Sequence, residues 1–312
     1  RAGKAGKQKV RFQYFEDCYK ENAFLAEDIR QTVQNGVPLS EIAVLFRTNM
    51  QPRALMEYMV SANLAFQTKD RIPDIYEHWI ARDFFTYIRI AQGSDSRADF
   101  LSIMNRPKRY IGRDSLPDET VCFDEWMKLY EEQPWIAERI EKLWYDLKHL
   151  SRLSPYAAIN YIRRGIGYDD YLAEYAEYRN ANKEDFYEVA DEILASAKGY
   201  RTFEEWFAHI EEYRQELKRL AQEKRRNQNA VTFATLHSAK GLEFTKVYLI
   251  DVNEGVMPYK KAVLKQDVEE ERRLFYVGMT RAKESLTICS VKKMRGKEVE
   301  LSRFIKEAGK EP

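Results

Sequence analysis

Two short segments near the carboxyl end of this 312-residue chain combine residue types that can handle phosphate groups. TLHSAKGLEF, residues 235–244, gathers a hydroxyl, an imidazole, an amine and a carboxylate around Gly241. TRA, residues 280–282, places Arg281 at the end of an amphipathic helical pattern. A planar guanidinium matches phosphate oxygens better than the point charge of lysine does. Arg281 is therefore our candidate for a cation that stabilises a phosphoryl group while its bond breaks.

Some of these residues also have a structural interpretation. Arg281 can be a solvated helix-end residue paired with Glu284. A single histidine near a strand end, such as His237, is more often a hydrogen-bonded structural residue than a ligand. Arg272 and Arg273 follow three glutamates at the spacing of helical ion pairs, so we interpret them as structural. The residue types alone leave the alternatives for Arg281 and His237 open.

Short β-branched runs alternate with helical patterns at both ends of the chain. The predicted strands are 10–15, 42–46, 231–236, 246–252 and 285–290, and the predicted helices lie near 22–35, 52–62 and 268–283. This alternation predicts an α/β fold with a parallel sheet covered on both faces. Ligands of such sheets gather at the carboxyl ends of the strands. We therefore expect Arg47 and Asn49 to lie at one ligand-binding strand end and Thr235 and Gly241 to lie at another.

The middle of the chain, residues 76–227, differs in composition. Its apolar residues recur at helical spacing, it holds all five tryptophans, and it is net acidic between net basic flanks within an overall charge of +1. We predict one α/β domain, 1–75 with 228–312, interrupted by an all-helical insertion at 76–227. The tryptophans are expected in the core of the insertion, and the basic run 218–226 at an exposed helix end.

The two segments rich in phosphate-binding residue types carry a family resemblance. TLHSAKGLEF, followed by EEERRLFYVGMTRAKESL at 269–286, resembles motifs V and VI of the UvrD/Rep/PcrA group of superfamily 1 DNA helicases. The resemblance implies a RecA-like 2A domain, P-loop NTPase-like, split by a helical 2B domain. No GxxxxGK[ST] phosphate loop occurs in the chain. We therefore expect a separate N-terminal 1A/1B half, and expect this chain alone to be inactive and to bind no cofactor stably.

The resemblance also assigns roles within motifs V and VI. Arg281 would be the catalytic arginine finger, and Glu243, beside Gly241, would bond the ribose of ATP. Lys240 would couple the nucleotide to the DNA. Thr235 and His237 would contact the backbone of a single strand.

Further DNA contacts follow from the same resemblance, and we expect Arg47 and Asn49, at their strand end, to be among them. Tyr259, in GVMPY, stands where close relatives often have histidine and still offers one hydrogen bond. IMNRPKRYIGRDSL at 103–116 resembles the 2B segment N-x-P-x-R-G-I-G, with Tyr110 at the usual glycine, which disfavours a close backbone approach. The candidate duplex contacts in this segment are Lys108, Arg109, Ile111, Gly112 and Arg113. The alternative for this segment is a solvated loop.

These observations predict the C-terminal part of an ATP-dependent 3′–5′ DNA helicase or translocase that uses ATP and Mg²⁺. The expected partners are single-stranded DNA, single/double-strand junctions, the N-terminal half, and repair or replication proteins on 2B. The alternative is a non-catalytic DNA-binding or protein-docking module that retains the fold.

Composition adds expectations about metals and location. Cys18, Cys122 and Cys289 form no CxxC pair, and Asp251 follows a strand without the context of a metal ligand, so we expect no bound zinc and no disulfide. No apolar run has the length of a membrane span and no signal peptide is evident. We expect a cytoplasmic, nucleoid-associated protein of bacterial type with no membrane partner.

Overall fold

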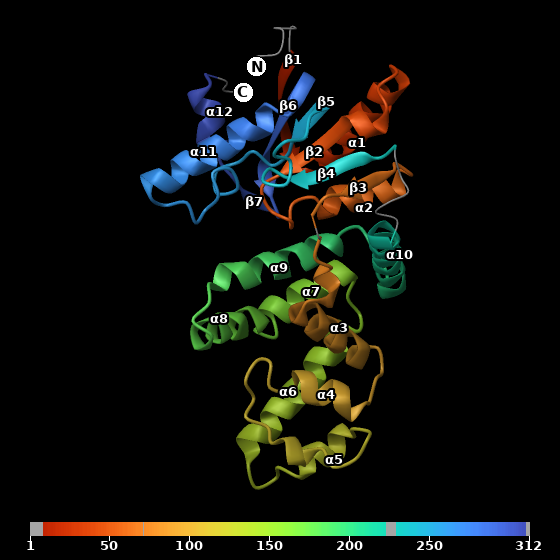
Figure 1. Cartoon of the computed structure of the whole chain (residues 1–312). Helices are drawn as coiled ribbons and strands as arrows, with labels where there is room; N and C mark the ends of the chain where they lie inside the picture. The colour runs from red at the N-terminus through yellow and green to blue at the C-terminus, as the bar shows by residue number, and fades with distance from the viewer. Residues whose placement is uncertain (1–8, 71, 223–228, 310–312) are drawn as a thin grey trace. The chain divides into compact units, whose positions relative to one another are not determined.

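The computed structural model describes residues 9–70, 72–222 and 229–309. The chain forms two compact units: unit 1 is Arg1–Pro73 with Glu212–Pro312, and unit 2 is Asp74–Glu211 (Figure 1). Helix α10 (Phe203–Gln222) continues through the second boundary, whereas composition led us to place that boundary after residue 227. Lys218 and Arg219 of the basic run are exposed on α10, and residues 223–226 of that run lie outside the described residues.

The described part of unit 1 contains one seven-stranded sheet in the order β1-β6-β5-β2-β4-β3, with every neighbouring pair parallel. A short β7 pairs antiparallel with β6 outside this path. The predicted α/β class is therefore confirmed. The strands are β1 (Lys9–Asp17), β2 (Ile42–Phe46), β3 (Phe66–Thr68), β4 (Val231–Thr235), β5 (Phe244–Leu249), β6 (Ala282–Met294) and β7 (Lys297–Glu298).

Helices cover both faces of this sheet, as β5 illustrates. Alternate residues of a strand point to opposite faces. Lys246 and Tyr248 each bond Asp28 of α1 at 2.6 Å, while Val247 and Leu249 lie in the apolar cluster shared with α11 and α12. Figure 1 shows α1 and α2 on one side of the sheet and α11 and α12 on the other. These helices are α1 (Cys18–Gln34), α2 (Arg53–Ser61), α11 (Lys265–Met279) and α12 (Arg303–Glu307).

Local signals explain most element ends. β2 spans the predicted 42–46 and is buried throughout. Helix α1 stops just before Gly36, whose φ of +92° lies in the left-handed region that glycine adopts readily. The predicted helix 268–283 is wrong at its end, because α11 stops at Met279 and β6 begins at Ala282. The Arg281 Nε donates to the Val277 carbonyl at 2.9 Å, so this side chain satisfies a last-turn carbonyl and closes the helix.

Unit 2 is helical, with one isolated β-bridge between Ser96 and Thr120. Trp126 and Trp206 are buried core residues as predicted, but Trp135 is 49% exposed, so the core prediction is wrong for that residue. No helix among the described residues has both the length and the apolar character needed to cross a bilayer. Besides α10, the helices are α3 (Trp79–Ala91), α4 (Arg97–Ile103), α5 (Phe123–Lys128), α6 (Pro134–Leu150), α7 (Pro155–Arg164), α8 (Tyr168–Tyr178) and α9 (Lys183–Ser196).

Candidate functional site

Arg281 lies in the turn between α11 and β6, hydrogen-bonded to the segment that contains Glu243. Its Nη1 donates to the Leu242 carbonyl at 2.9 Å, and the Phe244 N–H donates to the Arg281 carbonyl at 2.9 Å. The guanidinium also donates to the Val277 carbonyl and the Thr280 hydroxyl, both at 2.9 Å. These acceptors are neutral oxygens, so they orient the guanidinium without neutralising its charge. The structure thus brings together the two residues that we assigned to the nucleotide, Arg281 and Glu243.

The position of this pair corrects one sequence expectation. Thr235 ends β4, but the chain then runs back through a turn at Gly241, φ +85°, so that Glu243 immediately precedes the amino end of β5. Arg281 likewise precedes the amino end of β6. We expected Gly241 at a carboxyl strand end together with Thr235. The structure instead divides motif V between the two ends of the parallel strands.

Gly278 is a residue of this region whose role the sequence did not indicate. A Cβ at this position would lie 2.3 Å from Cδ2 of Leu236 and 3.2 Å from Cδ2 of Leu249. Both leucines are buried, so they have little room to move away. Glycine therefore lets α11 pack closely on the sheet, which sets the position of the turn that carries Arg281.

At the carboxyl end of β2, Arg47 is neutralised by a carboxylate. Its Nε and Nη2 contact the Glu271 carboxylate at 2.8–3.1 Å, and its guanidinium carbon lies 5.1 Å from the centroid of the Tyr259 ring. The Tyr259 N–H also donates to Glu271, at 3.1 Å. Two predicted DNA-binding residues, Arg47 and Tyr259, are thus brought together, but around an acid that compensates the charge of Arg47. Asn49 is partly buried in the same loop.

Thr235, at the carboxyl end of β4, also contacts an acid. Its N–H and hydroxyl donate to the Asp70 carboxylate at 2.7 and 3.2 Å, and the Ser238 hydroxyl donates to the same carboxylate at 2.5 Å. His237 and Lys240 are exposed in the following turn. β2 and β4 are adjacent, with Phe46 in register with Thr235. The predicted single-strand contacts therefore gather at one end of the sheet.

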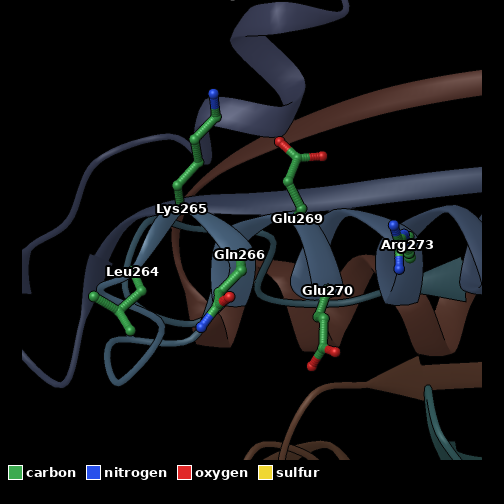
Figure 2. A pocket seen from close by; sticks show the side chains of 6 residues that line it. All are labelled: Leu264, Lys265, Gln266, Glu269, Glu270 and Arg273. Atoms are coloured by element: carbon green, nitrogen blue, oxygen red, sulfur yellow. The ribbon is translucent and has the colours of Figure 1, made fainter.

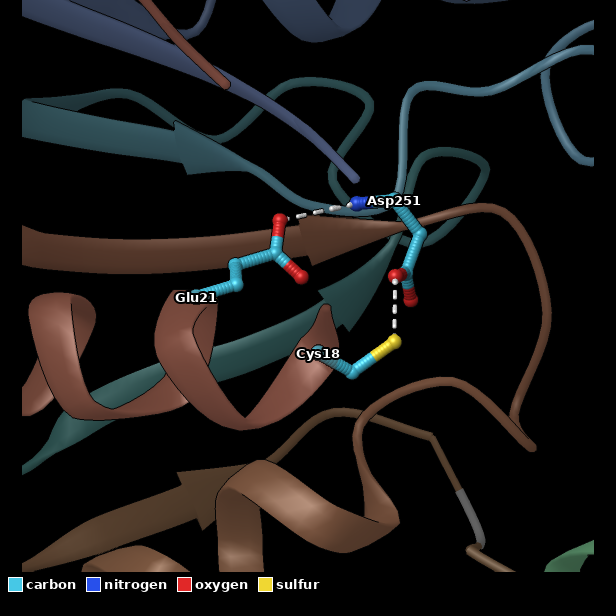
Figure 3. A group of neighbouring side chains, drawn as sticks. All are labelled: Cys18, Glu21 and Asp251. Carbon is cyan, nitrogen blue, oxygen red and sulfur yellow. Dashed lines mark hydrogen bonds between the residues drawn. The ribbon is translucent and has the colours of Figure 1, made fainter. Parts of the chain in front are cut away.

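A buried group of acidic side chains lies near the same strand ends. Figure 3 shows Cys18 Sγ at 3.7 Å from a carboxylate oxygen of Asp251, and the Asp251 N–H donating to Glu21 at 3.3 Å. Burial raises the pKa of Glu21 well above its ordinary value, and the nearby Asp251 carboxyl raises it further. Gln51 links the group to the Arg47 loop, because its Nε2 lies 3.3 Å from Asp251 and its Oε1 accepts the Arg47 N–H at 2.8 Å. The three side chains have metal-ligand types, and the raised pKa of Glu21 favours its neutral acid form.

A depression of about 620 Å³ lies along the first turns of α11 and is open at the surface. Figure 2 shows Lys265 and Glu269 pointing to one side of the helix and Gln266 and Glu270 to the other. None of the predicted site residues lines it. On the same helix, Arg272 pairs with Glu269 at 3.3 Å, which confirms its structural interpretation.

In unit 2, the expectation that Arg109 grips duplex phosphates is wrong. Its side chain is buried, and its guanidinium donates to the carbonyls of Ile103, Met104 and Pro107 at 3.0–3.4 Å and to the Tyr87 hydroxyl at 3.3 Å. These bonds fold the turn around the arginine. A buried guanidinium with four such acceptors is a structural brace and is not accessible to DNA.

Some of the remaining residues of this turn are also held inside unit 2, and others are exposed. The Ile111 N–H donates to Asn105 at 3.1 Å and the Gly112 N–H to the Tyr130 hydroxyl at 3.2 Å, so both amides are already used inside unit 2. Ile111 is also buried, which corrects its assignment as a contact. Lys108 and Arg113 are exposed, and Lys108 pairs with Glu174 at 3.1 Å.

Tyr110, which stands where the resemblance led us to expect glycine, has a positive φ. Its φ is +58°, in the left-handed region where a side chain costs energy that glycine avoids. Its ring is 66% exposed and lies 5.2 Å from the guanidinium carbon of Arg139. A backbone conformation that favours glycine is thus adopted here by a residue whose aromatic side chain lies at the surface.

Comparison with known proteins identifies the chain. The family model described as the UvrD-like helicase C-terminal domain matches residues 2–121 and 122–293. The putative ATP-dependent DNA helicase YjcD of Bacillus subtilis is 27% identical over 303 residues, covering 93% of this chain and 39% of that protein. The ATP-dependent DNA helicase PcrA of B. subtilis is 28% identical over 312 residues, with 91% and 41% covered.

The ATP-dependent DNA helicase Rep of Escherichia coli is 27% identical over 303 residues, with 88% of this chain and 44% of that protein covered. The chain thus spans about two-fifths of the length of these relatives. Because the family model extends over most of the chain, through both segments rich in phosphate-binding residue types, the chain belongs to the UvrD-like helicase C-terminal domain family.

Proposed function

We propose that this chain is the C-terminal part, domains 2A and 2B, of an ATP-dependent helicase that moves 3′ to 5′ along single-stranded DNA. Unit 1 corresponds to 2A and unit 2 to 2B. One observation carries the proposal: Arg281 bonds the carbonyl of Leu242, next to Glu243, and its hydrogen-bond partners among the described residues are neutral oxygens. A module without a nucleotide partner has no use for a cation fixed in this way on the segment that carries Glu243.

In the proposed mechanism the N-terminal half supplies the phosphate loop, and ATP binding closes that half onto unit 1. Closure brings Arg281 to the γ-phosphate, where its guanidinium stabilises the charge that builds on the phosphoryl oxygens. Mg²⁺ bound with the nucleotide would neutralise part of the same charge. Glu243 accepts a hydrogen bond from a ribose hydroxyl, and the Gly241 turn lets the backbone reach that position. Hydrolysis then reopens the two halves.

The DNA contacts are assigned to the carboxyl strand ends of unit 1 and to unit 2. Thr235, His237 and Asn49 would bond the single strand, and Lys240, on the turn between Thr235 and Glu243, would couple DNA to nucleotide. Arg47 and Tyr259 are weaker candidates, because Glu271 compensates the guanidinium. On unit 2, the exposed Lys108 and Arg113 would touch duplex phosphates at a single/double-strand junction. Repair or replication proteins would dock on unit 2, and the protein would act at the nucleoid.

The test compares the full-length protein with the 312-residue chain alone. ATP hydrolysis is measured with and without single-stranded DNA, in the presence of Mg²⁺. The full-length protein should hydrolyse ATP faster when DNA is added, and the chain alone should neither hydrolyse nor retain nucleotide. Arg281→Ala in the full-length protein should lose this hydrolysis, and Lys283→Ala is its matched control, because Lys283 lies two residues from Arg281 and pairs with Glu41 at the surface, at 3.1 Å.

Two outcomes contradict the proposal. Hydrolysis by the chain alone would mean that it holds a nucleotide site that does not need the other half. A full-length protein that binds DNA without turning over ATP would support the alternative, a non-catalytic DNA-binding module that retains the fold.

A further inference from the structure

Three hydrogen-bond donors from motif V converge on a single carboxylate. The Thr235 N–H lies 2.7 Å from one oxygen of Asp70, and the hydroxyls of Thr235 and Ser238 lie 3.2 and 2.5 Å from the other. The Ser238 N–H also donates to the Thr235 hydroxyl at 3.2 Å, which fixes the orientation of that hydroxyl. These donors of Thr235 and Ser238 form a preformed cradle at the carboxyl end of β4. The cradle is occupied by an acid that lies 165 residues away in sequence.

The backbone path of β3 explains how Asp70 reaches the cradle. β3 pairs with β4 only as far as Thr68 opposite Phe233, and the Lys69 N–H makes one more bond to the Phe233 carbonyl at 2.9 Å. β3 therefore stops short of Thr235. The Asp70 side chain accepts the bond from the Thr235 N–H that a longer β3 would have accepted with a backbone carbonyl.

The hydrogen-bond donors of this cradle suit a phosphodiester as well as a carboxylate. Both groups carry one negative charge shared by two exposed oxygens, and both accept hydrogen bonds from N–H and hydroxyl donors. The three donors around Asp70 are neutral, so they select for an anionic acceptor without pairing its charge. The exposed His237 and Lys240 follow in the same turn and add donors for a neighbouring phosphate.

We propose that Thr235 and Ser238 form a phosphate cradle for single-stranded DNA, and that Asp70 occupies this cradle as an intramolecular competitor that must leave before the strand can bind. The inference rests on the proposed function and adds to it a regulatory residue. Asp70 stands four positions before Asp74, where unit 2 begins. The competitor is thus carried by the segment of chain that leads from unit 1 into unit 2.

Asp70→Asn tests the competition, because asparagine keeps one acceptor oxygen for the Thr235 N–H but loses the charge. Binding of a fluorescent oligothymidylate to the 312-residue chain is followed by anisotropy at fixed salt. If the cradle is open in about a tenth of wild-type molecules, the variant should bind up to about tenfold more tightly, the limit for a cradle that is fully open. Glu298→Gln, which removes an exposed acid elsewhere in unit 1, is the matched control and should leave the affinity unchanged.

A double-mutant cycle with Ser238→Ala separates competition from general electrostatics. Competition requires the donors, so the gain from Asp70→Asn should shrink several-fold when Ser238 is alanine. A charge effect acting through solvent would give the same gain in both backgrounds, and that result would overturn the inference. A gain seen for ATP with Mg²⁺ instead of DNA would overturn it too, because the donors would then serve the nucleotide.

A second measurement covers the case in which Asp70→Asn fails to fold. In the wild-type chain, the amide resonance of Thr235 should shift when the oligonucleotide is added, because its acceptor changes from carboxylate to phosphate. An unchanged Thr235 resonance in a chain that binds DNA overturns the inference and leaves the proposed function standing. Failure of the wild-type chain and every variant to bind the oligonucleotide would remove the DNA assignment of this strand end together with the inference.

Discussion

Two sets of site residues, at opposite ends of the sheet in unit 1, have opposite kinds of partner. At the carboxyl ends of β2 and β4, Glu271 neutralises Arg47 and Asp70 fills the donors of Thr235 and Ser238. At the amino ends of β5 and β6, Arg281 is held by neutral oxygens and keeps its charge available. Both regions carry helicase motifs, so motif membership alone does not distinguish an accessible ligand group from a compensated one.

The difference teaches that the partner of an arginine decides its role. Backbone carbonyls fix the direction of a guanidinium and leave a net charge for a phosphate, whereas a carboxylate cancels that charge over a short distance. We therefore expect the amino ends to dominate catalysis. The carboxyl ends should show their function only when their internal acids are displaced.

The largest expected effect is at the amino ends. In the full-length protein, Arg281→Ala should lower kcat by about 10³ or more, the range for arginine fingers, because the transition-state charge loses its cation. Steady-state ATP hydrolysis at saturating DNA measures this, with thermal unfolding as the check on folding. An unchanged kcat would place the finger elsewhere and would remove the contrast between the two ends.

Glu271→Gln tests the carboxyl end of β2, where Glu271 compensates the charge of Arg47. It leaves Arg47 without its carboxylate, and we expect unit 1 to lose about 2 kcal/mol of unfolding free energy. This is less than the cost of breaking a fully buried pair, because the Arg47 side chain is 20% exposed. Urea unfolding of the 312-residue chain gives the value. The comparison variant is Glu41→Gln at the amino ends, where the carboxylate is 38% exposed, and a loss as large as that of Glu271→Gln would contradict our view of the two ends.

Glu243→Ala refines the description of the amino ends. In the full-length protein it should raise the KM for ATP by weakening a contact worth on the order of 1–3 kcal/mol, with a smaller change in kcat. The 3′-deoxy analogue of ATP identifies the contact, since the wild type should discriminate against it and the variant should not. Equal discrimination by both proteins would mean that Glu243 does not bind the ribose.

The smallest effect is expected from substitutions in unit 2. Unit 2 is not part of the sheet, so it is a reference for the comparison of the two sheet ends. Lys108→Ala with Arg113→Ala should flatten the dependence of log K on log salt by about 0.9 per contact for a duplex with a 3′ tail, and should leave a short single strand unaffected. Glu174→Gln, which frees Lys108, should steepen the same dependence. Equal loss on both substrates would show that the turn is not a duplex grip.

Sequence patterns were sufficient for several elements whose signals are local. The apolar run 42–46 is β2 to the residue, and Gly36 marks the end of α1. The alternation of strands and helices was enough for the α/β class and for a helical insertion. Hydrophobic periodicity, capping and glycine conformations depend on neighbours a few positions away, which a single sequence displays.

The partners of the site residues could not be predicted, because they are distant in sequence. Glu271 lies 224 positions from Arg47, and Asp70 lies 165 positions from Thr235. A motif also gives no information on burial, so Arg109 was assigned to DNA although the fold encloses it in carbonyl oxygens. The division of motif V between two strand ends depends on the path of the turn at Gly241, which residue spacing does not specify.

The sheet order also has a consequence for the time at which unit 1 can form. β1 pairs only with β6 in the described sheet, Lys9 opposite Ser285, so during synthesis β1 waits for a strand that is made 276 residues later. At about 5–20 residues per second, this interval is roughly 14–55 s. Unit 2, continuous from Asp74 to Glu211, can fold within it. Unit 2 is thus able to fold first, while β1, β2 and β3 still lack the strands with which they pair.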